Sequence, residues 1–378
     1  MNRDLTVGRP ETVLWKFTLP LLGSVLFQQM YNIADSLIAG KFVGEQALAA
    51  VGNAYEITLV YLAFAVGCNI ASSVIVARLF GAKDYSRMKT AIGTGVTVSA
   101  VLCGILMLLG FLLMPKLLVL INTPAKIFDG TLLYMNIYTG GLFFLFFYNL
   151  LTGIFSAMGD SRTPFIFLAF SSSANVVLDY FFVTGFEMGV SGVAWATFIC
   201  QGVSCILVII TMIRRLRKID SGGKVVIFSG RMFRDFVRIA VPSTLQQLSV
   251  SVGNIFIQSI VNSLGTGVVA GYSAAVKLNN LTVTTFFTIG NGMSNFTSQN
   301  LGAKKPERIG SGYKGGMKMA AVIYIPVFIL FFFFGATFIN LFLKAGSSEE
   351  ALSVGVSVDA PGVSAVGCFS ASGTSPAG

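Results

Sequence analysis

Three carboxylates interrupt long apolar segments of this 378-residue sequence: Asp35, Glu56 and Asp179. Glu56 falls at the start of its segment, where a position at the water interface explains it best. Asp35 and Asp179 fall well inside theirs, and a charged Asp at the centre of a membrane costs at least ~2.5–3.5 kcal/mol. Because the chain contains no His, proton chemistry at neutral pH would have to use these carboxylates.

Further oxygen-bearing side chains are expected at the same depth as the two carboxylates. Asp35 and Asp179 both fall roughly 8–10 Å below the outer membrane boundary, at 1.5 Å of rise per residue. Asn175 precedes Asp179 by four residues, which places both on one helix face, and Thr197 falls in the same layer. Such hard oxygen ligands suit a proton or Na⁺ better than a transition metal. We therefore predict that Asp35, Asp179, Asn175 and Thr197 form a coupling site, with hydrogen bonding between helices as the structural alternative for Asn175 and Thr197.

Composition indicates the elements that must position these residues. The chain is 54% hydrophobic and 11% charged, whereas soluble domains carry about 25% charged residues. Its apolar residues form runs of about 20 or more, the length that a membrane-spanning helix needs. We predict an all-α polytopic membrane protein with about nine transmembrane helices, near residues 13–38, 54–77, 90–114, 132–155, 163–186, 191–213, 236–262, 273–298 and 316–343.

The distribution of basic residues predicts the topology. With the N-terminus in the cytoplasm, 21 of the 26 Lys and Arg residues fall on the inner side. The net charge of +10 is therefore explained by topology, and no nucleic acid partner is predicted. The cysteines show no CxxC spacing, so neither a metal site nor a cofactor is predicted. We expect a multi-pass protein of the plasma (inner) membrane whose partners are the lipid bilayer and a small substrate.

An internal repeat relates the two parts of the chain. A shift of 222 residues aligns Pro20 with Pro242 and Asn32 with Asn254, and a shift of 221 aligns the Gly-Ala-Lys sequences at 81–83 and 302–304. The repeat predicts two parallel-oriented six-helix lobes, of which the second is incomplete. The predicted divisions are an N-terminal lobe at 1–213, a basic cytoplasmic linker at 214–235 and a partial C-terminal lobe of about three helices at 236–352. Amides of the first and seventh helices are predicted to line a substrate cavity: Gln28, Gln29, Asn32, Gln246, Gln247 and Asn254.

The segment 353–378 departs from this pattern. It contains six Ser, five Gly and four Ala residues but no Leu, Ile or Met, a composition that cannot form a packed core. We expect an aberrant low-complexity tail, and a truncation or frameshift of the gene is the hypothesis that explains it.

Two stretches carry a family resemblance. The sequence from Pro20 to Gly52, PLLGSVLFQQMYNIADSLIAGKFVGEQALAAVG, and that from Asn175 to Thr197, NVVLDYFFVTGFEMGVSGVAWAT, resemble the multidrug and toxic compound extrusion (MATE) family. The resemblance extends over about residues 1–355. It implies a Na⁺- or H⁺-driven antiporter that exports organic, often cationic, compounds, with Asp35, Asn175, Asp179 and Thr197 at the family's coupling positions. Gln246 and Gln247 stand where the NorM-like branch uses acids, so the chain resembles the DinF-like branch more.

Several rival functions remain open at this point. A flippase for a lipid-linked precursor should carry several basic residues in its cavity, whereas the predicted helices offer only Lys277. An enzyme is not predicted, because HExxH, GxSxG and P-loop motifs are absent from the sequence. A truncated membrane fragment without transport activity is the third alternative. The prediction that we carry forward is a monomeric secondary transporter for small organic, cationic compounds.

Overall fold

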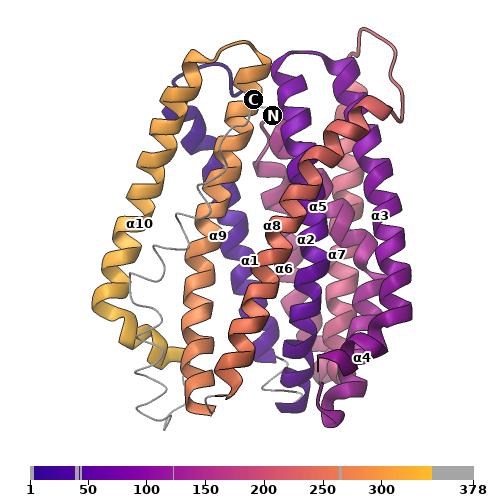
Figure 1. Cartoon of the computed structure of the whole chain (residues 1–378), viewed down its shortest axis with the longest axis vertical. Coiled ribbons are helices and arrows are strands. Elements are labelled where there is room, and N and C mark those ends of the chain that lie inside the picture. The colour runs from indigo at the N-terminus through magenta and orange to yellow at the C-terminus, as the bar shows by residue number, and fades with distance from the viewer. Residues whose placement is uncertain (1–3, 39–41, 43–44, 122, 264–265, 343–378) are drawn as a thin grey trace.

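The computed structural model describes residues 4–38, 42, 45–121, 123–263 and 266–342 of the chain (Figure 1). Helices and connecting turns make up this part, without a strand. The elements are α1 (Pro10–Ile38), α2 (Glu45–Gly81), α3 (Tyr85–Leu120), α4 (Ala125–Gly140), α5 (Leu142–Ala157), α6 (Arg162–Tyr180), the π-helix η2 (Phe181–Gly185), α7 (Gly189–Lys218), α8 (Gly230–Ser263), α9 (Thr266–Gly302) and α10 (Glu307–Phe342).

Each of the nine predicted segments falls on one of these helices or on the α4–α5 pair. Within the described residues, four segments are long and apolar enough to cross a membrane: Ala50–Gly81, Tyr85–Leu120, Arg162–Gly185 and Gly189–Lys218. The α4–α5 pair would make a fifth span. The all-helical prediction is therefore confirmed for the described part, whereas nine membrane crossings stay a prediction.

The segment predicted as one helix near 132–155 is instead bent. α4 and α5 meet at an angle of 49°, and the break lies at Gly141, directly after Gly140. Glycine suits this position because the ring of Phe198 on α7 comes close: a Cβ on Gly141 would lie 3.0 Å from Phe198 Cδ2. The bend therefore lies where Phe198 of α7 packs against the chain. The length of an apolar run does not reveal such a contact.

The face of α3 that points away from the bundle is apolar. Val101, Ile105, Leu108 and Leu112 recur at helical spacing and are all exposed. The opposite face buries Ser99 and other small residues against the bundle. An exposed apolar stripe of this length is unfavourable in water and favourable in hydrocarbon, so it supports an integral membrane position for the helix.

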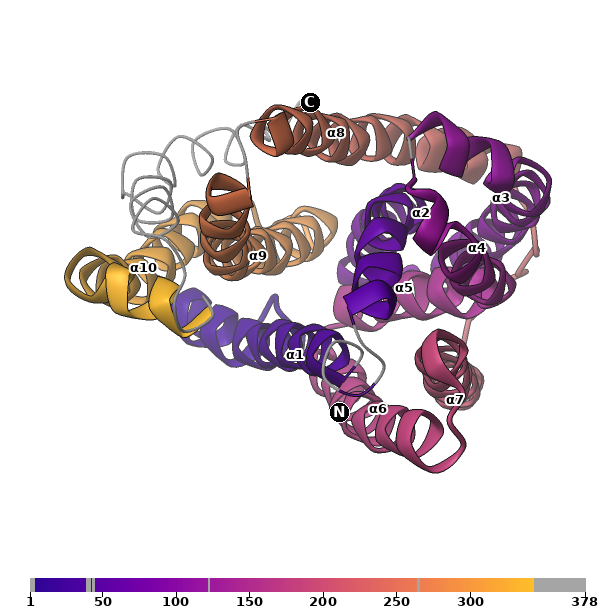
Figure 2. The same ribbon diagram turned by 90° about the horizontal axis from the view of Figure 1, so that it is seen from below.

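α2 occupies the middle of the bundle. It packs against α3, α4 and α5 on one side and against α8 and α9 on the other, and the view in Figure 2 shows it surrounded by these helices. α1 lies at the far side of the bundle beside α6, α9 and α10. The larger core cluster contains residues of α2, α3, α4, α5, α7 and α8. A smaller cluster packs Leu5, Leu14 and Phe17 against residues of α9 and α10.

The internal repeat is visible where α2 and α9 end. Lys83 and Lys304 both adopt left-handed backbone conformations, with φ of 58° and 57°. After each helix the same pair of backbone hydrogen bonds closes the turn. Lys83 N donates to Phe80 O and Asp84 N to Leu79 O after α2, and Lys304 N donates to Leu301 O and Lys305 N to Asn300 O after α9. This is the Schellman arrangement, and here Lys occupies the position that Gly usually takes. The repeated Gly-Ala-Lys sequence thus produces the same helix end twice.

The repeat-related ends of α2 and α9 also touch each other reciprocally. A Cβ on Gly81 would lie 2.0 Å from the carbonyl oxygen of Gln299, and a Cβ on Gly302 would lie 1.9 Å from that of Arg78. Further along the same helices, Ser73 Oγ donates to Asn295 Oδ1 at 2.7 Å, across 222 residues of sequence. The glycines therefore let two backbones approach more closely than any side chain would allow.

We expect Gly302→Ala to destabilise the protein, because the added methyl group can be accommodated only if α2 and α9 move apart. Overpacking of this kind costs about 1–3 kcal/mol. Thermal unfolding of the detergent-solubilised protein measures the loss. The matched control is Gly310→Ala on α10, where a Cβ meets nothing within 4 Å and where alanine favours the helix. Equal unfolding temperatures for the two variants would contradict the close approach.

The connection between α7 and α8 is shorter than the predicted linker 214–235, since it covers only residues 219–229. It lies against α3: Lys89 Nζ donates to Ile219 O at 2.6 Å, and Ser229 N donates to Thr94 Oγ1 at 3.1 Å. The other predicted division at the C-terminal end, residues 353–378, lies outside the described residues.

Candidate functional site

The first polar site lies on α6 and α7, which pack against each other. Asn175 and Asp179 are 2% and 0% exposed, and Thr197 on α7 is 4% exposed. The i to i+4 spacing places Asn175 and Asp179 on one face of α6, while Val177 and Tyr180 on other faces of that helix are exposed. The structure therefore buries these three predicted coupling residues, all on two adjacent helices.

α6 changes its geometry directly after Asp179. From Phe181 to Gly185 the chain forms a π-helix, which is followed by positive φ at Glu187 and at Gly189, the first residue of α7. π-helical turns are rare and frequently lie at functional sites. Here the turn ends the α-helix within two residues of the buried carboxylate.

α1 runs beside α6 at this site. The ring of Phe27 packs edge-on against that of Phe165 with centroids 5.7 Å apart, and Phe42 packs likewise against Tyr180 at 5.6 Å. The backbone of Asp35 belongs to α1 between these two contacts. Its side chain and that of Asn32 lie outside the described residues, so their part in the site stays a prediction.

A second polar feature is a cavity of about 190 Å³ among five helices. Its polar lining comes from α1, α2, α5 and α9 and consists of Ser24, Gln28, Asn69, Ser73, Asn149, Thr152, Ser156, Thr288, Asn291, Ser294 and Asn295. Every one of these side chains is uncharged. The cavity lies against the Ser73–Asn295 hydrogen bond, where the two repeats meet.

The predicted cavity amides separate into two groups. Gln28 lines the cavity, and the neighbouring Gln29 lies 3.5 Å from Thr284 Oγ1 on α9 as a hydrogen-bond donor. Gln246 and Asn254 on α8 are exposed, and Gln247 is half-buried. None of these three α8 amides is among the residues that line the cavity. Of the predicted cavity amides whose side chains the structure describes, Gln28 alone therefore lines this cavity.

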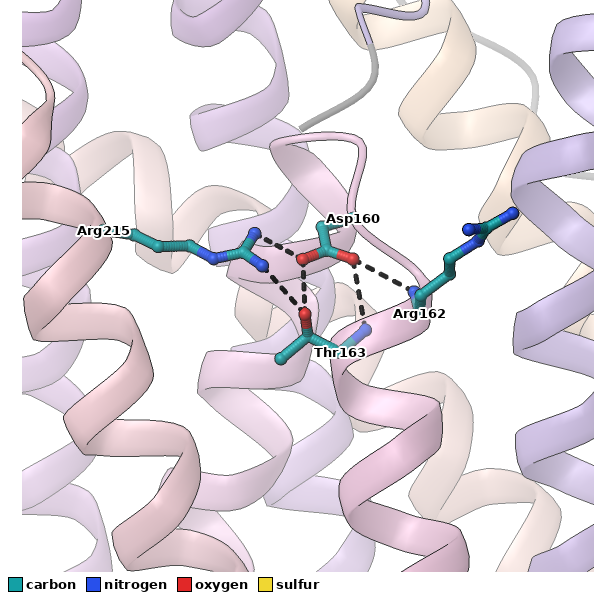
Figure 3. Close-up of polar contacts among 4 residues, drawn as sticks. All are labelled: Asp160, Arg162, Thr163 and Arg215. Carbon is teal, nitrogen blue, oxygen red and sulfur yellow. Dashed lines mark hydrogen bonds and ion pairs between the residues drawn. The ribbon is translucent and has the colours of Figure 1, made fainter. Parts of the chain in front are cut away.

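An ion pair that was not predicted from the sequence fixes the turn between α5 and α6. Arg215 on α7 pairs with Asp160 and donates to Thr163 Oγ1 at 2.8 Å (Figure 3). Its guanidinium also lies 5.0 Å from the centre of the Phe155 ring. Asp160 in turn accepts from the backbone N–H groups of Arg162 and Thr163, both at 3.1 Å. Sequence alone placed Arg215 in a basic linker, whereas it joins three helices.

Among the described residues, no group of three or more His, Cys, Asp and Glu side chains is placed to hold a metal ion. A buried carboxylate with an amide and a hydroxyl on adjacent helices offers oxygen ligands of the kind suited to a proton or an alkali cation. The cavity offers hydrogen-bonding amides and hydroxyls for an organic molecule.

The described residues form a helical bundle with an apolar outer stripe on α3, a buried carboxylate and a polar cavity at the junction of two repeats, a combination that fits a membrane transporter. The sequence model of the MatE family matches residues 20–181 and 242–357. The chain therefore belongs to the MatE family, and the family resemblance expected from the sequence is confirmed.

Individual relatives agree with this assignment. The chain is 28% identical over 358 residues to the "Probable multidrug resistance protein YpnP" of Bacillus subtilis (strain 168), covering 93% of this chain and 78% of that protein. It is 23% identical over 343 residues to the "FAD transporter" of Shewanella oneidensis, covering 89% of this chain and 74% of that protein.

Solved structures share the fold. A MOP superfamily transporter from Pyrococcus furiosus superposes with a TM-score of 0.87 at 21% identity, covering 97% of this chain and 84% of that one. A multidrug resistance MATE family transporter in an outward-facing conformation superposes with a TM-score of 0.85 at 22% identity, covering 95% and 80%.

Proposed function

We propose that this protein is a secondary active efflux transporter that exchanges H⁺ or Na⁺ for organic, cationic compounds by alternating access. The observation that carries the proposal is the fully buried Asp179, with Asn175 and Thr197 on adjacent helices. A carboxylate inside a membrane helix is costly and marks an ion or proton pathway by default. Family membership and the multidrug resistance names of relatives support export of small organic molecules.

In this proposal Asp179 is the group whose charge changes during the cycle, and Asp35 is its partner on α1. Asn175 and Thr197 supply neutral oxygen atoms beside the carboxylate. An ion can drive the cycle only if it binds the outward and inward states with different affinities. α1 packs along α6, so neutralising Asp179 changes the electrostatic environment of α1. We therefore propose α1 as the helix that shifts in response.

The cavity is proposed as the inner part of the substrate path. Its uncharged lining recognises hydrogen-bonding groups and leaves the positive charge of a cargo to be balanced by the carboxylates of α1 and α6. The described lining also lacks the Arg and Lys residues that a pyrophosphate-carrying lipid precursor would require. This favours the efflux proposal over a flippase. The two predicted lobes, 1–213 and 236–352, would rock about the contact between α2 and α9.

Dye efflux tests the proposal in cells. Cells that express the chain and are loaded with ethidium should lose the dye several-fold faster than cells that carry the empty vector. Collapse of the proton and sodium gradients with ionophores should abolish the difference. Equal efflux with and without the chain, at confirmed membrane expression, would contradict the proposal.

A further inference from the structure

The carbonyl group of Ala157 at the end of α5 needs a partner from outside its own helix. The helix ends in a Schellman motif, with Asp160 N donating to Phe155 O and Gly159 N donating to Ser156 O, both at 2.9 Å. Gly159 takes the left-handed position, with φ of 78°. These bonds satisfy two of the last carbonyl groups and leave that of Ala157, the final helical residue.

Gln299 on α9 supplies that partner. Its Nε2 donates to Ala157 O at 2.6 Å, and its Oε1 accepts from the backbone N–H of Leu5 at 3.0 Å. The side chain is 0% exposed. One buried amide thus joins α9 both to α5, in the first repeat, and to the segment that precedes α1.

The segment before α1 is held at several further points. Asn300 Nδ2 donates to Leu5 O at 3.3 Å, and Lys305 Nζ donates to Thr6 O at 3.1 Å. Leu5 is fully buried in the core cluster formed with α1, α9 and α10. Residues 4–6 therefore lie as a strap beneath the ends of α5 and α9, on the side that topology predicts to be cytoplasmic.

The acceptor on α5 is held rigidly. The ion pair of Asp160 with Arg215, together with the bonds of Asp160 to the first turn of α6, fixes the turn that follows Ala157 (Figure 3). On the other side, the backbone of Gln299 lies against Gly81 at the end of α2. Separation of α9 from α5 would therefore break the hydrogen bond from Gln299 to Ala157 O, whereas residues 4–6, which Asn300 and Lys305 also hold, would stay with α9.

We propose that Gln299 is the latch of the cytoplasmic closure: its amide, oriented by the strap of residues 4–6, ties α9 to the end of α5, and it must release Ala157 O when the cytoplasmic side opens. This inference rests on the proposed alternating-access function. A latch stabilises the closed state by the bonds that exist only there, and removing it shifts the population toward the open state.

The test measures the distance between the two repeats by pulsed electron paramagnetic resonance. Nitroxide labels are placed at Arg87→Cys and Glu307→Cys, which are exposed in the first turns of α3 and α10, in a variant whose five native cysteines are replaced by Ala. For Gln299→Ala we expect the ratio of closed to open molecules to fall about tenfold, since the buried hydrogen bond to Ala157 O, present only in the closed state, is lost.

Gln299→Glu sharpens the test because it conserves shape. A carboxylate still accepts from the Leu5 N–H but cannot donate to Ala157 O, so we expect the same direction of shift. Gln201→Ala on α7 is the control and should keep the parent distribution. A parent distribution in both Gln299 variants would overturn the latch. Because the measurement needs no cargo or gradient, it is independent of the efflux assay, whose failure would count against the proposed function instead.

Discussion

Asp179→Asn is expected to abolish gradient-driven efflux, reducing it to the level of membranes without the protein. The amide keeps the size of the side chain and much of its hydrogen bonding but can neither bind a proton nor carry a negative charge. Asp179 is fully buried with Asn175 on one face of α6, so the substitution acts inside the proposed coupling site and not at the protein surface. The measurement is dye efflux from energised vesicles, normalised to the amount of protein in the membrane.

Glu187→Gln is the matched control, since it removes a carboxylate that lies exposed in the turn just beyond η2. We expect this variant to transport within a factor of about two of the parent, as exposed charges contribute little. If Asp179→Asn and Glu187→Gln transported equally well, Asp179 would be a structural residue and not the coupling group.

The second large effect is expected for stability and not for coupling. Arg215→Ala should lower the free energy of unfolding by about 3 kcal/mol, the lower end of the range for breaking a buried ion pair. The lower end applies because the Arg215 side chain is 22% exposed, whereas that of Asp160 is 3% exposed. The substitution also removes the hydrogen bond to Thr163 and the contact with the Phe155 ring.

Thermal unfolding in detergent, followed by the fluorescence of Trp15 and Trp195, measures this loss. Arg162→Ala is the control, because that side chain is exposed and such substitutions usually change stability by less than about 0.5 kcal/mol. Arg215→Lys should fall between the two, since an ammonium can pair with Asp160 but lacks the planar fork of a guanidinium. Unfolding temperatures that are the same for Arg215→Ala and Arg162→Ala would refute the bracing role.

The helices and the repeat were predictable because both appear as patterns in the amino-acid sequence. Apolar runs locate the helices, and the recurring Gly-Ala-Lys sequence relates two helix ends. The structure adds that both ends place a Lys in the left-handed conformation, at Lys83 and Lys304. The burial of Asn175, Asp179 and Thr197 also agrees with the sequence, since polar residues inside apolar runs must be sheltered from lipid.

Features that depend on contacts between distant segments were not predictable. The bend at Gly141 reflects the approach of Phe198, which no local pattern encodes. Arg215 stands in a run of basic residues that topology explains, so its pairing with Asp160 left no separate signal. A boundary between two helices at Asp160 was predictable, because Gly159 is typical of the end of one helix and Asp160 of the start of the next. The sequence around Gln299 does not distinguish this residue from other polar residues near helix ends, so its contacts with Ala157 and Leu5 were not predicted.

Other predictions stay predictions. The Asp35 carboxylate and the segment 353–378 lie outside the described residues, and the coupling role of the first and the aberrant character of the second are predictions from the sequence. The choice between Na⁺ and H⁺, the inner-membrane orientation, the monomeric state and the DinF-like assignment likewise belong to the proposal.

The most direct test of the central claim is transport by purified protein in liposomes under imposed gradients. Ethidium is placed at equal concentration on both sides, and either a proton gradient or a sodium gradient is imposed alone. We predict that one of the two gradients drives the dye to accumulate on one side and that Asp179→Asn removes this accumulation. Dye that only equilibrates, whichever gradient is imposed, would contradict ion-coupled efflux.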